Sequence, residues 1–189
     1  SGWAADCKYA NNAVSGVDKL ALSPDGATLY VAGRFDRIGT AKRRRLAAVN
    51  ASTAALTAWN PAPYSASGTK VNDIALSADG QRLYLVGRFN EIGGQTGLGV
   101  HGILACVSTA TGNMLTGWTR KSNLDWNIDF YAVQPTPNEQ NVLAAGNFTQ
   151  IEARTGYKGL AAFGMDEGSP FEWRPAAENP VEAHKILYA

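Results

Sequence analysis

The chain has few of the residues that bind metal ions or form disulfides. Its 189 residues include two cysteines and two histidines. Cys7 and Cys106 lie far apart, so they permit one disulfide but no disulfide framework, and we favour two isolated, mostly buried thiols. Neither His101 nor His184 lies near cysteines or paired carboxylates at the spacing of metal ligands. The sequence therefore predicts no metal site and no cofactor.

Excess charge and long apolar runs are also lacking. The formal net charge is +1, which gives no overall attraction to nucleic acid. No apolar run is long enough to span a membrane, and no signal peptide is visible at the start. One basic run stands out, "KRRR" at 42–45. It could be a heparin-like or nucleic-acid patch, a targeting signal or a protease site, but its place between two strands favours a solvated loop.

Catalytic signatures are missing as well. The sequence contains no H-E-x-x-H, no G-x-S-x-G and no phosphate-binding P-loop. The glycine-rich segment "GGQTGLGVHG" (93–102) lacks the strand-then-helix context of a phosphate loop, so we interpret it as a flexible loop. No catalytic residue is predicted and a non-catalytic protein is favoured, although distant residues can still assemble an active site.

What the chain does contain is a repeat. The segment "VDKLALSPDGATLYVAGRFDRIG" begins at Val17, "VNDIALSADGQRLYLVGRFNEIG" at Val71, and the more divergent "FYAVQPTPNEQNVLAAGNFTQIE" at Phe130. The glycine of the "GRF" or "GNF" motif recurs after 54 and then 59 residues. This period predicts repeat units at 17–70, 71–127 and 128–180, with 1–16 ending a preceding unit and 181–189 starting a further one.

Each unit is expected to form four short strands. In the first unit these are "KLALS", "TLYVAGRF", "RLAAVNA" and "LTAW". Alternating apolar residues favour strands, and Asp-Gly between the first two favours a hairpin turn. No segment shows sustained helical periodicity. The predicted fold class is all-β, with propeller-like four-stranded blades in three complete repeats plus partial repeats at both ends.

The stretch "YVAGRFDRIG…RLAAVNASTAALTAWNP" resembles the delta-60 repeat, a propeller-type family of unknown function. The resemblance covers residues 17–180 and implies an extracellular or cell-surface location. The family pattern has a pair of glycines, and the first of the pair is Ala32, Val86 or Ala145 in this chain. The loop glycine of the pattern is Glu152 in the third unit. Because a propeller needs about four blades to close, we expect the chain to be part of a larger propeller or to complete one with another chain.

The "GRFDRIG" motif has a structural interpretation. Its glycine would let a neighbouring blade approach closely, its phenylalanine would fill the space between blades, and its isoleucine would hold the outgoing loop against the core. A tryptophan closes each unit. The structural repeat positions are Gly33, Phe35, Ile38, Trp59, Gly87, Phe89, Ile92, Trp118, Gly146, Phe148, Ile151 and Trp173.

One position in the motif is a candidate for ligand binding. Arg34 and Arg88 recur there, and Asn147 replaces them in the third unit. Together they could form a ring of donors for a carboxylate, a sugar or a phosphate. The alternative is an arginine whose stem packs on Tyr30 or Tyr84 while its guanidinium pairs with a nearby carboxylate or with loop carbonyl groups.

These observations favour a non-catalytic propeller scaffold for binding or assembly within a larger extracellular or surface protein. Its partners would be other protein chains or the remainder of a larger propeller, with no nucleic acid. One alternative is a carbohydrate-binding propeller, with Tyr64, Trp126 and Tyr157 stacking on sugars. Others are an enzyme with its active site in the central channel and an accessory subunit of a large assembly.

Overall fold

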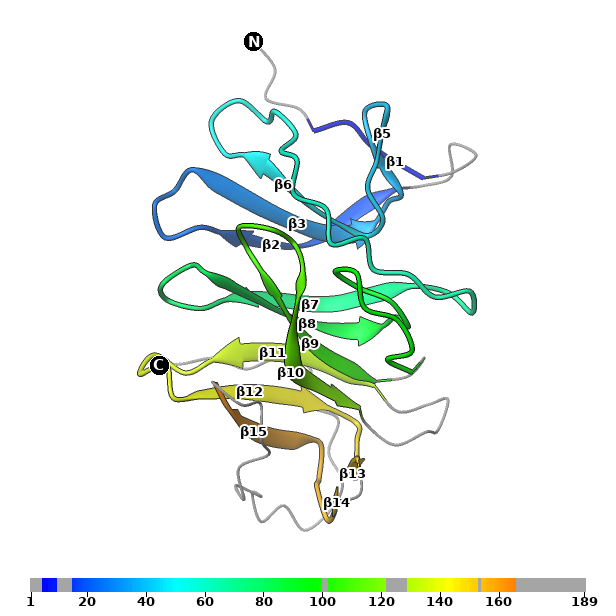
Figure 1. Cartoon of the computed structure of the whole chain (residues 1–189), viewed down its shortest axis with the longest axis vertical. Coiled ribbons are helices and arrows are strands. Elements are labelled where there is room, and N and C mark those ends of the chain that lie inside the picture. The colour runs from blue at the N-terminus through cyan, green and yellow to red at the C-terminus, as the bar shows by residue number, and fades with distance from the viewer. Residues whose placement is uncertain (1–4, 10–14, 100–101, 122–128, 153, 166–189) are drawn as a thin grey trace.

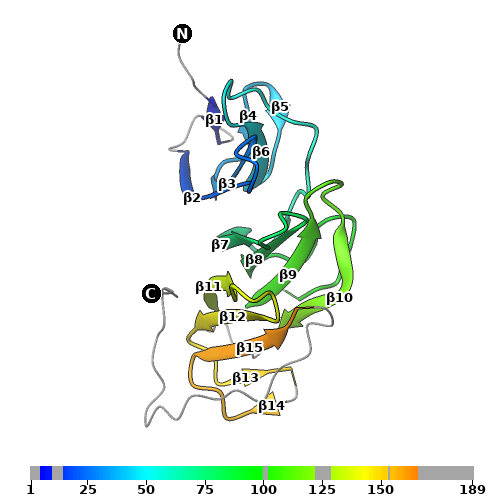
Figure 2. The same cartoon turned by 90° about the vertical axis from the view of Figure 1, so that its left-hand side faces the viewer.

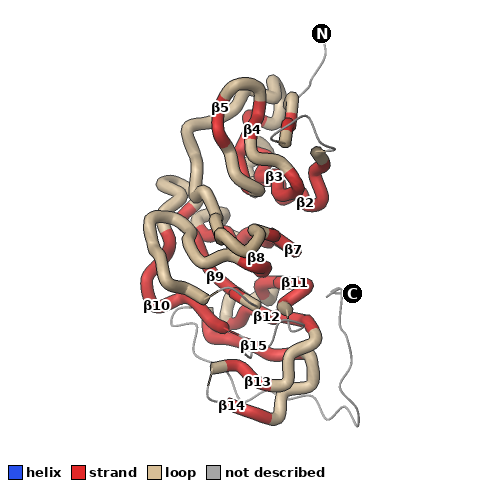
Figure 3. Tube along the Cα trace, turned by 90° about the vertical axis from the view of Figure 1, so that its right-hand side faces the viewer, coloured by secondary structure: helices blue, strands red, loops and turns tan. Residues whose placement is uncertain are grey.

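A computed structural model describes residues 5–9, 15–99, 102–121, 129–152 and 154–165. Every regular element in these ranges is a β-strand, and Figure 3 shows strands joined only by loops and turns. The part of the chain that the structure describes therefore has no apolar helix of membrane-spanning length. The all-β prediction is confirmed.

Three antiparallel sheets follow one another along the chain. They stack face to face down the long axis of the molecule (Figure 1), and the strand that opens each sheet lies on the same side of the stack (Figure 2). The first and third sheets lie at opposite ends, so the described sheets form an open stack and no closed ring (Figure 1). In order across each sheet, the strands are β2 (Gly16–Leu22), β3 (Thr28–Arg34) and β6 (Leu46–Asn50); β7 (Lys70–Leu76), β8 (Arg82–Arg88), β9 (Ile103–Ser108) and β10 (Met114–Lys121); and β11 (Phe130–Pro135), β12 (Asn141–Gly146) and β15 (Leu160–Gly164).

The Asp-Gly turns form as the sequence predicts. In the first hairpin the Asp25 carboxylate accepts hydrogen bonds from the Ser23 hydroxyl at 2.5 Å and from the backbone N–H of residue 27 at 2.9 Å. Gly26 follows with φ of 71°, a left-handed conformation that glycine adopts at little cost. In the second hairpin Asp79 accepts the hydroxyl of Ser77 at 2.6 Å. Local hydrogen bonds of this kind fix where each hairpin reverses.

Among the described residues, four strands are found only in the second sheet. In the first sheet the expected fourth strand makes one bridge, Leu56 with Val49, and one backbone hydrogen bond, from Thr57 to the residue 48 carbonyl. The chain then leaves the sheet, because Trp59 reaches the next sheet and Pro61 has no N–H to continue the ladder. The fourth strand of the third unit would fall beyond residue 165, outside the described residues.

The isoleucine of the motif lies in a small hairpin beside each sheet. In the first unit β4 (Arg37–Ile38) pairs with β5 (Ala41–Lys42), and β1 (Cys7–Lys8) extends this hairpin. In the third, β13 (Gln150–Ile151) pairs with β14 (Arg154–Thr155). The turn residues Gly39, Gly93 and Glu152 all have positive φ, of 59°, 54° and 54°. The third loop therefore keeps the turn although glutamate replaces glycine. The isoleucines Ile38, Ile92 and Ile151 are all buried.

The sequence predicts that the motif glycines let neighbouring blades approach closely, but this prediction is wrong. Each glycine instead makes room for backbone that belongs to its own sheet. A Cβ on Gly33 would lie 2.1 Å from the Gly16 carbonyl oxygen, which belongs to the neighbouring strand of the same sheet. The corresponding distances are 2.1 Å from Gly87 to the Lys70 carbonyl and 2.1 Å from Gly146 to the residue 129 carbonyl. Each sheet has a register irregularity at this point, between residues 17 and 19 in the first. The glycine makes room for this bulge.

The core lies between sheets. One cluster joins the first sheet to the second, and another joins the second to the third, with the side chains of Phe89 and Phe148 fully buried in them. Phe35 is also fully buried, in a smaller cluster on the other face of the first sheet. The residues of the first sheet in the first interface are Tyr30, Ala32, Leu46, Ala48 and Trp59, and those of the second sheet include Val71, Ile74, Leu83, Leu85, Ala105 and Val107.

Tryptophans tie successive sheets together. The indole N–H of Trp59 donates to the Ser108 carbonyl at the end of β9 at 3.0 Å, and its ring packs edge-on against Tyr30 with centroids 5.0 Å apart. Trp118 donates to the Met165 carbonyl just after β15 at 2.7 Å. Both rings are buried, so their polar atoms need the partners that the next sheet supplies. Trp173 lies outside the described residues.

Candidate functional site

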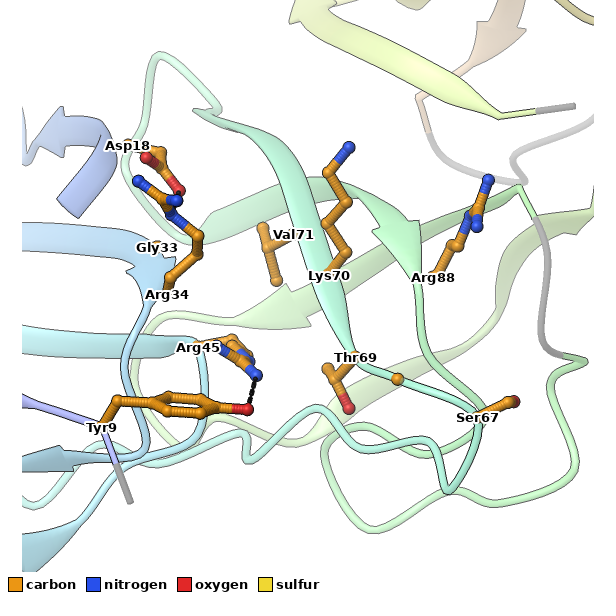
Figure 4. Close-up of a pocket in the computed structure, with 11 residues that line it drawn as sticks. Tyr9, Asp18, Gly33, Arg34, Arg45, Ser67, Thr69, Lys70, Val71 and Arg88 are labelled. Atoms are coloured by element: carbon orange, nitrogen blue, oxygen red, sulfur yellow. Dashed lines mark hydrogen bonds and ion pairs between the residues drawn. The ribbon is translucent and has the colours of Figure 1, made fainter. Parts of the chain in front are cut away.

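A pocket of about 480 Å³ opens between the first and second sheets. It lies where β3 and β8 end and where β7 begins, beside the loop of residues 65–69 (Figure 4). Both motif arginines, Arg34 and Arg88, line it. Two cations that the sequence analysis did not single out as site residues join them there, Arg45 and Lys70.

The pocket is strongly basic. Four cationic side chains line it, and Asp18 is the one acidic residue among its lining residues. Lys70 and Arg88 are directly opposite each other in the register of β7 and β8, so their side chains leave the same face of the sheet. Like charges in that relation repel and destabilise the strand pair. Figure 4 shows both side chains extending in the same direction.

The two motif arginines differ in how firmly they are held. Arg88 donates from Nε and Nη2 to one carboxylate oxygen of Asp129, each at 2.8 Å, and the Asp129 side chain is 4% exposed. The hydrogen bond to Asp129 raises the pKa of the Arg88 guanidinium. Arg34 lies 3.7 Å from the Asp18 carboxylate, and both side chains are largely exposed. Arg88 is thus paired with a carboxylate, as the alternative interpretation of the sequence predicts. Arg34 is also near a carboxylate, but at a longer distance and in an exposed position.

Asn147 does not line this pocket. The side-chain oxygen of Asn147 accepts a hydrogen bond from the backbone N–H of Asp129 at 2.7 Å. The backbone N–H of Asn147 donates to the backbone carbonyl of Asp129 at 3.2 Å. Asn147 therefore helps hold the acid that pairs with Arg88. The structure brings Arg34 and Arg88 to one pocket and places Asn147 at the next interface, and ligand binding by the three residues stays a prediction.

The basic run at 42–45 is mostly engaged with the protein, so the solvated loop expected from the sequence does not describe it, and Lys42 is the last residue of β5. Lys42 is exposed. Arg43 donates from Nη2 to the Thr57 carbonyl at 2.8 Å, and the Arg44 guanidinium lies 4.3 Å from the centroid of the Tyr64 ring. Sequence reasoning missed this because the partners come from distant positions.

Arg45 is the most constrained residue of the pocket. Its Nη2 donates to the Tyr9 hydroxyl at 2.9 Å (dashed line in Figure 4), and its guanidinium lies 4.6 Å from the centroid of that ring. Its φ is 59°, a left-handed conformation that costs a non-glycine residue about 1 to 2 kcal/mol. The surrounding structure therefore holds Arg45 in a strained position that aims its side chain at Tyr9.

The aromatic residues named for sugar stacking are poorly placed for it. Tyr157 is 2% exposed, so its ring faces cannot receive a sugar. Tyr64 has a guanidinium stacked on it. Trp126 lies outside the described residues. Among the residues that the structure describes, no three His, Cys, Asp or Glu side chains lie close enough together to hold a metal ion.

A second surface feature is the outer face of the first sheet. Three apolar side chains of β2 are exposed there: Val17 at 42%, Leu20 at 61% and Leu22 at 55%. In β7, Val71 and Ile74 occupy the positions equivalent to Val17 and Leu20. They are only 4% and 5% exposed, because the first sheet covers them. In β11 the equivalent residues 130 and 133 are 0% and 2% exposed.

Neither a family model nor a curated protein sequence matches the chain. Among solved structures, it is similar to the β-propeller domain of Cps50 (Swd1) from Myceliophteria thermophila, with a TM-score of 0.51 at 12% identity over 86% of this chain and 44% of that one. A eukaryotic initiation factor gives 0.50 at 14% identity over 88% and 33%. A proposed 6-phosphogluconolactonase from Bacteroides uniformis gives 0.48 at 20% identity over 83% and 39%. The chain thus spans less than half the length of each, and the likeness to the first two shows a propeller-like fold.

Proposed function

We propose that the protein is a non-catalytic β-propeller scaffold whose first sheet binds another sheet of the same repeat type. That sheet would belong to a partner chain or to more of the same protein. A delta-60-type propeller at the cell surface, as the sequence resemblance implies, is part of this proposal. The observation that carries it is the exposure of Val17, Leu20 and Leu22 on β2. The equivalents of Val17 and Leu20 in the next two sheets are buried, and Leu76, the equivalent of Leu22 in β7, is partly buried.

The chain itself indicates what would cover this face. The equivalent face of the second sheet packs against Tyr30, Leu46 and Trp59 of the first. A covering sheet with such aromatic and aliphatic groups would remove three half-exposed side chains from water. At about 1 kcal/mol for each, this would contribute about 3 kcal/mol to association.

Polar contacts between sheets support the same arrangement. Lys19 of β2 reaches the Asp73 carboxylate of β7 at 3.2 Å. That carboxylate also accepts the backbone N–H of Val133 in β11 at 3.1 Å, and the Asn72 amide donates to the Phe130 carbonyl at 2.7 Å. Side chains of each first strand thus reach the first strand of the next sheet. A sheet in front of β2 could make contacts of this kind with it.

The proposal can be tested by thiol labelling in a Cys7→Ser background. One form is the original 189-residue chain. The other form carries an extra copy of residues 17–70 inserted directly before Val17. The extra copy then joins the first repeat in the same way as residue 70 joins residue 71. Leu20→Cys should react rapidly in the first form and at least about tenfold more slowly in the second, because the added sheet buries it. Ile74→Cys is the matched control and should be protected in both forms.

Rapid labelling of Leu20→Cys in the extended protein would contradict the proposal, provided that Ile74→Cys stays protected. That result would mean that the extra repeat folds elsewhere and that this face does not accept a sheet of the same type.

A further inference from the structure

We propose that the basic pocket between the first two sheets binds a small polyanion that carries at least two negative charges on oxygen atoms. The site lies on Arg34, Arg45, Lys70 and Arg88, away from the exposed face of β2. This inference goes beyond the scaffold proposed above, because it needs no additional sheet.

The first argument is unbalanced charge. Four cations line the pocket, and the carboxylates beside them are Asp18 in its wall and Asp129 behind Arg88. Two positive charges therefore lack a matching carboxylate in the part of the chain that the structure describes. Within the described ranges Lys70 takes part in no ion pair or hydrogen bond of its side chain, although it faces Arg88 across the strand pair. An anion between them would turn a repulsive pair into two favourable contacts.

The second argument is the strained backbone of Arg45. Gly159 has the equivalent place in the third sheet: its N–H donates to the Phe148 carbonyl as that of Arg45 does to the Phe35 carbonyl. Gly159 also has positive φ, 79°, against 59° for Arg45. The third sheet thus meets this conformation with the residue that tolerates it, whereas the first sheet holds an arginine there. Fold alone does not require the arginine, and its side chain points to the pocket.

The third argument is the size and lining of the pocket. A volume of about 480 Å³ is in the range of small-molecule sites. Besides the cations, Tyr9, Ser67 and Thr69 line the pocket, and each of these residues has a hydroxyl group. Hydroxyl and guanidinium donors together suit oxyanions, which accept several hydrogen bonds at once. Arg45 covers one face of the Tyr9 ring, so the cationic and hydroxyl groups are the contacts that the pocket offers to charged oxygen atoms.

The experiment is calorimetric titration of the whole chain at low salt with inorganic pyrophosphate and, separately, with citrate. We expect saturable binding at one site by at least one of the two, weakening as salt rises because the contact is ionic. Tighter pyrophosphate binding would identify a phosphate ligand, and tighter citrate binding a carboxylate ligand. If neither anion binds saturably, the proposal is wrong.

Two variants and one control locate the site. Lys70→Ala should weaken binding about tenfold through loss of one charged contact. The Lys70 side chain is exposed, so its removal should leave the fold intact. Arg45→Gly should weaken binding by a similar factor while the melting temperature changes little, since glycine suits the left-handed backbone. Lys42→Ala removes the same charge from an exposed position in β5 that does not line the pocket, and it should leave affinity within twofold. Equal losses for Lys42→Ala and Lys70→Ala would show diffuse charge attraction and overturn the proposal.

Discussion

Each cysteine has a different environment. Cys106 lies fully buried in the cluster between the second and third sheets, whereas Cys7 is half-buried in the outer hairpin of the first unit, and both are free thiols. The expectation of two isolated thiols is confirmed. Burial raises the pKa of Cys106 to about 12, because the thiolate would lose its hydration in an apolar interior. Burial likewise raises the pKa of Tyr84, which shares this cluster.

The raised pKa of Cys106 predicts a loss of stability at alkaline pH. In the unfolded chain this thiol titrates near 9.0, below its value in the folded protein. The folded state therefore keeps a proton that the unfolded state releases, so this contribution is complete below pH 9 and is lost as pH rises from 9 to 12. Urea unfolding between pH 8 and 10 should show a decline in the free energy of unfolding of about 1 kcal/mol between pH 9 and 10 from this group, approaching about 1.4 kcal/mol per pH unit at higher pH.

Cys106→Ala is the control for that decline. The variant starts from lower stability because it loses packing, but its free energy of unfolding should fall less steeply above pH 9. An unchanged slope would assign the decline to other groups, among them Tyr84.

At the level of the strand, the bulge opposite the motif glycine is the feature shared by all three sheets. It shifts the first strand of each sheet against the second, at the point where the carbonyl group of Gly16, Lys70 or residue 129 lies against the motif glycine. The outermost residue pairs of these strands are Gly16 with Arg34 and Lys70 with Arg88, and both arginines directly follow the motif glycines. The bulge therefore sets where the basic side chains of the pocket leave the strands.

Gly33→Ala should be strongly destabilising. Its Cβ would lie 2.1 Å from a carbonyl oxygen of the backbone, which cannot rotate away as a side chain can. We expect a loss of about 3 kcal/mol, at the upper end of overpacking effects. Gly26→Ala is the matched control: its Cβ meets nothing within 4 Å, so only the left-handed backbone opposes it, at about 1 kcal/mol. Chemical denaturation of both variants measures the difference, and equal losses would mean that the bulge relaxes freely.

The sequence predicts strands and turns well where the signal is local. Apolar alternation and Asp-Gly turns place β2, β3, β7 and β8, because period and turn chemistry act within a few residues. The missing fourth strand of the first sheet was not predicted, since "LTAW" has strand character and only Pro61 and the contact of Trp59 with the next sheet divert it.

The candidate site was predicted only in part. Arg34 and Arg88 stand out because they repeat, but Lys70 and Arg45 do not, and Tyr9 lies in a segment with no repeat signal of its own. Their meeting depends on how two sheets pack, which no single stretch of sequence encodes. The positive φ of Arg45 leaves one trace, its alignment with Gly159 of the third unit.

Across the whole molecule, the sheets differ in how much of their surface is covered. The second sheet has a core cluster on each face, whereas the first exposes one side of β2 to solvent. In stacked repeats, stability depends on such nearest-neighbour contacts, so the sheet covered on both faces should open least often.

Hydrogen exchange followed by mass spectrometry should reveal this gradient. Peptides from β8 and β9 should exchange most slowly, and peptides from β2 at least about tenfold faster. The amides of β7 are the internal comparison, because β7 has the same place in its sheet as β2 but is covered by the preceding sheet. Equal protection of β2 and β7 would show that the stack opens as one cooperative unit.

The two faces that meet at each described interface are different in kind. The face of the earlier sheet carries a tyrosine and a tryptophan at both interfaces. The face of the later sheet carries a valine and an isoleucine at the first interface, and a valine and a phenylalanine at the second. Contacts between unlike surfaces are heterologous, so association through them has a direction. Copies joined by the exposed side of β2 would add head to tail and form a ring or a growing fibre, whereas a two-fold symmetric dimer would bring together two faces that this packing never pairs.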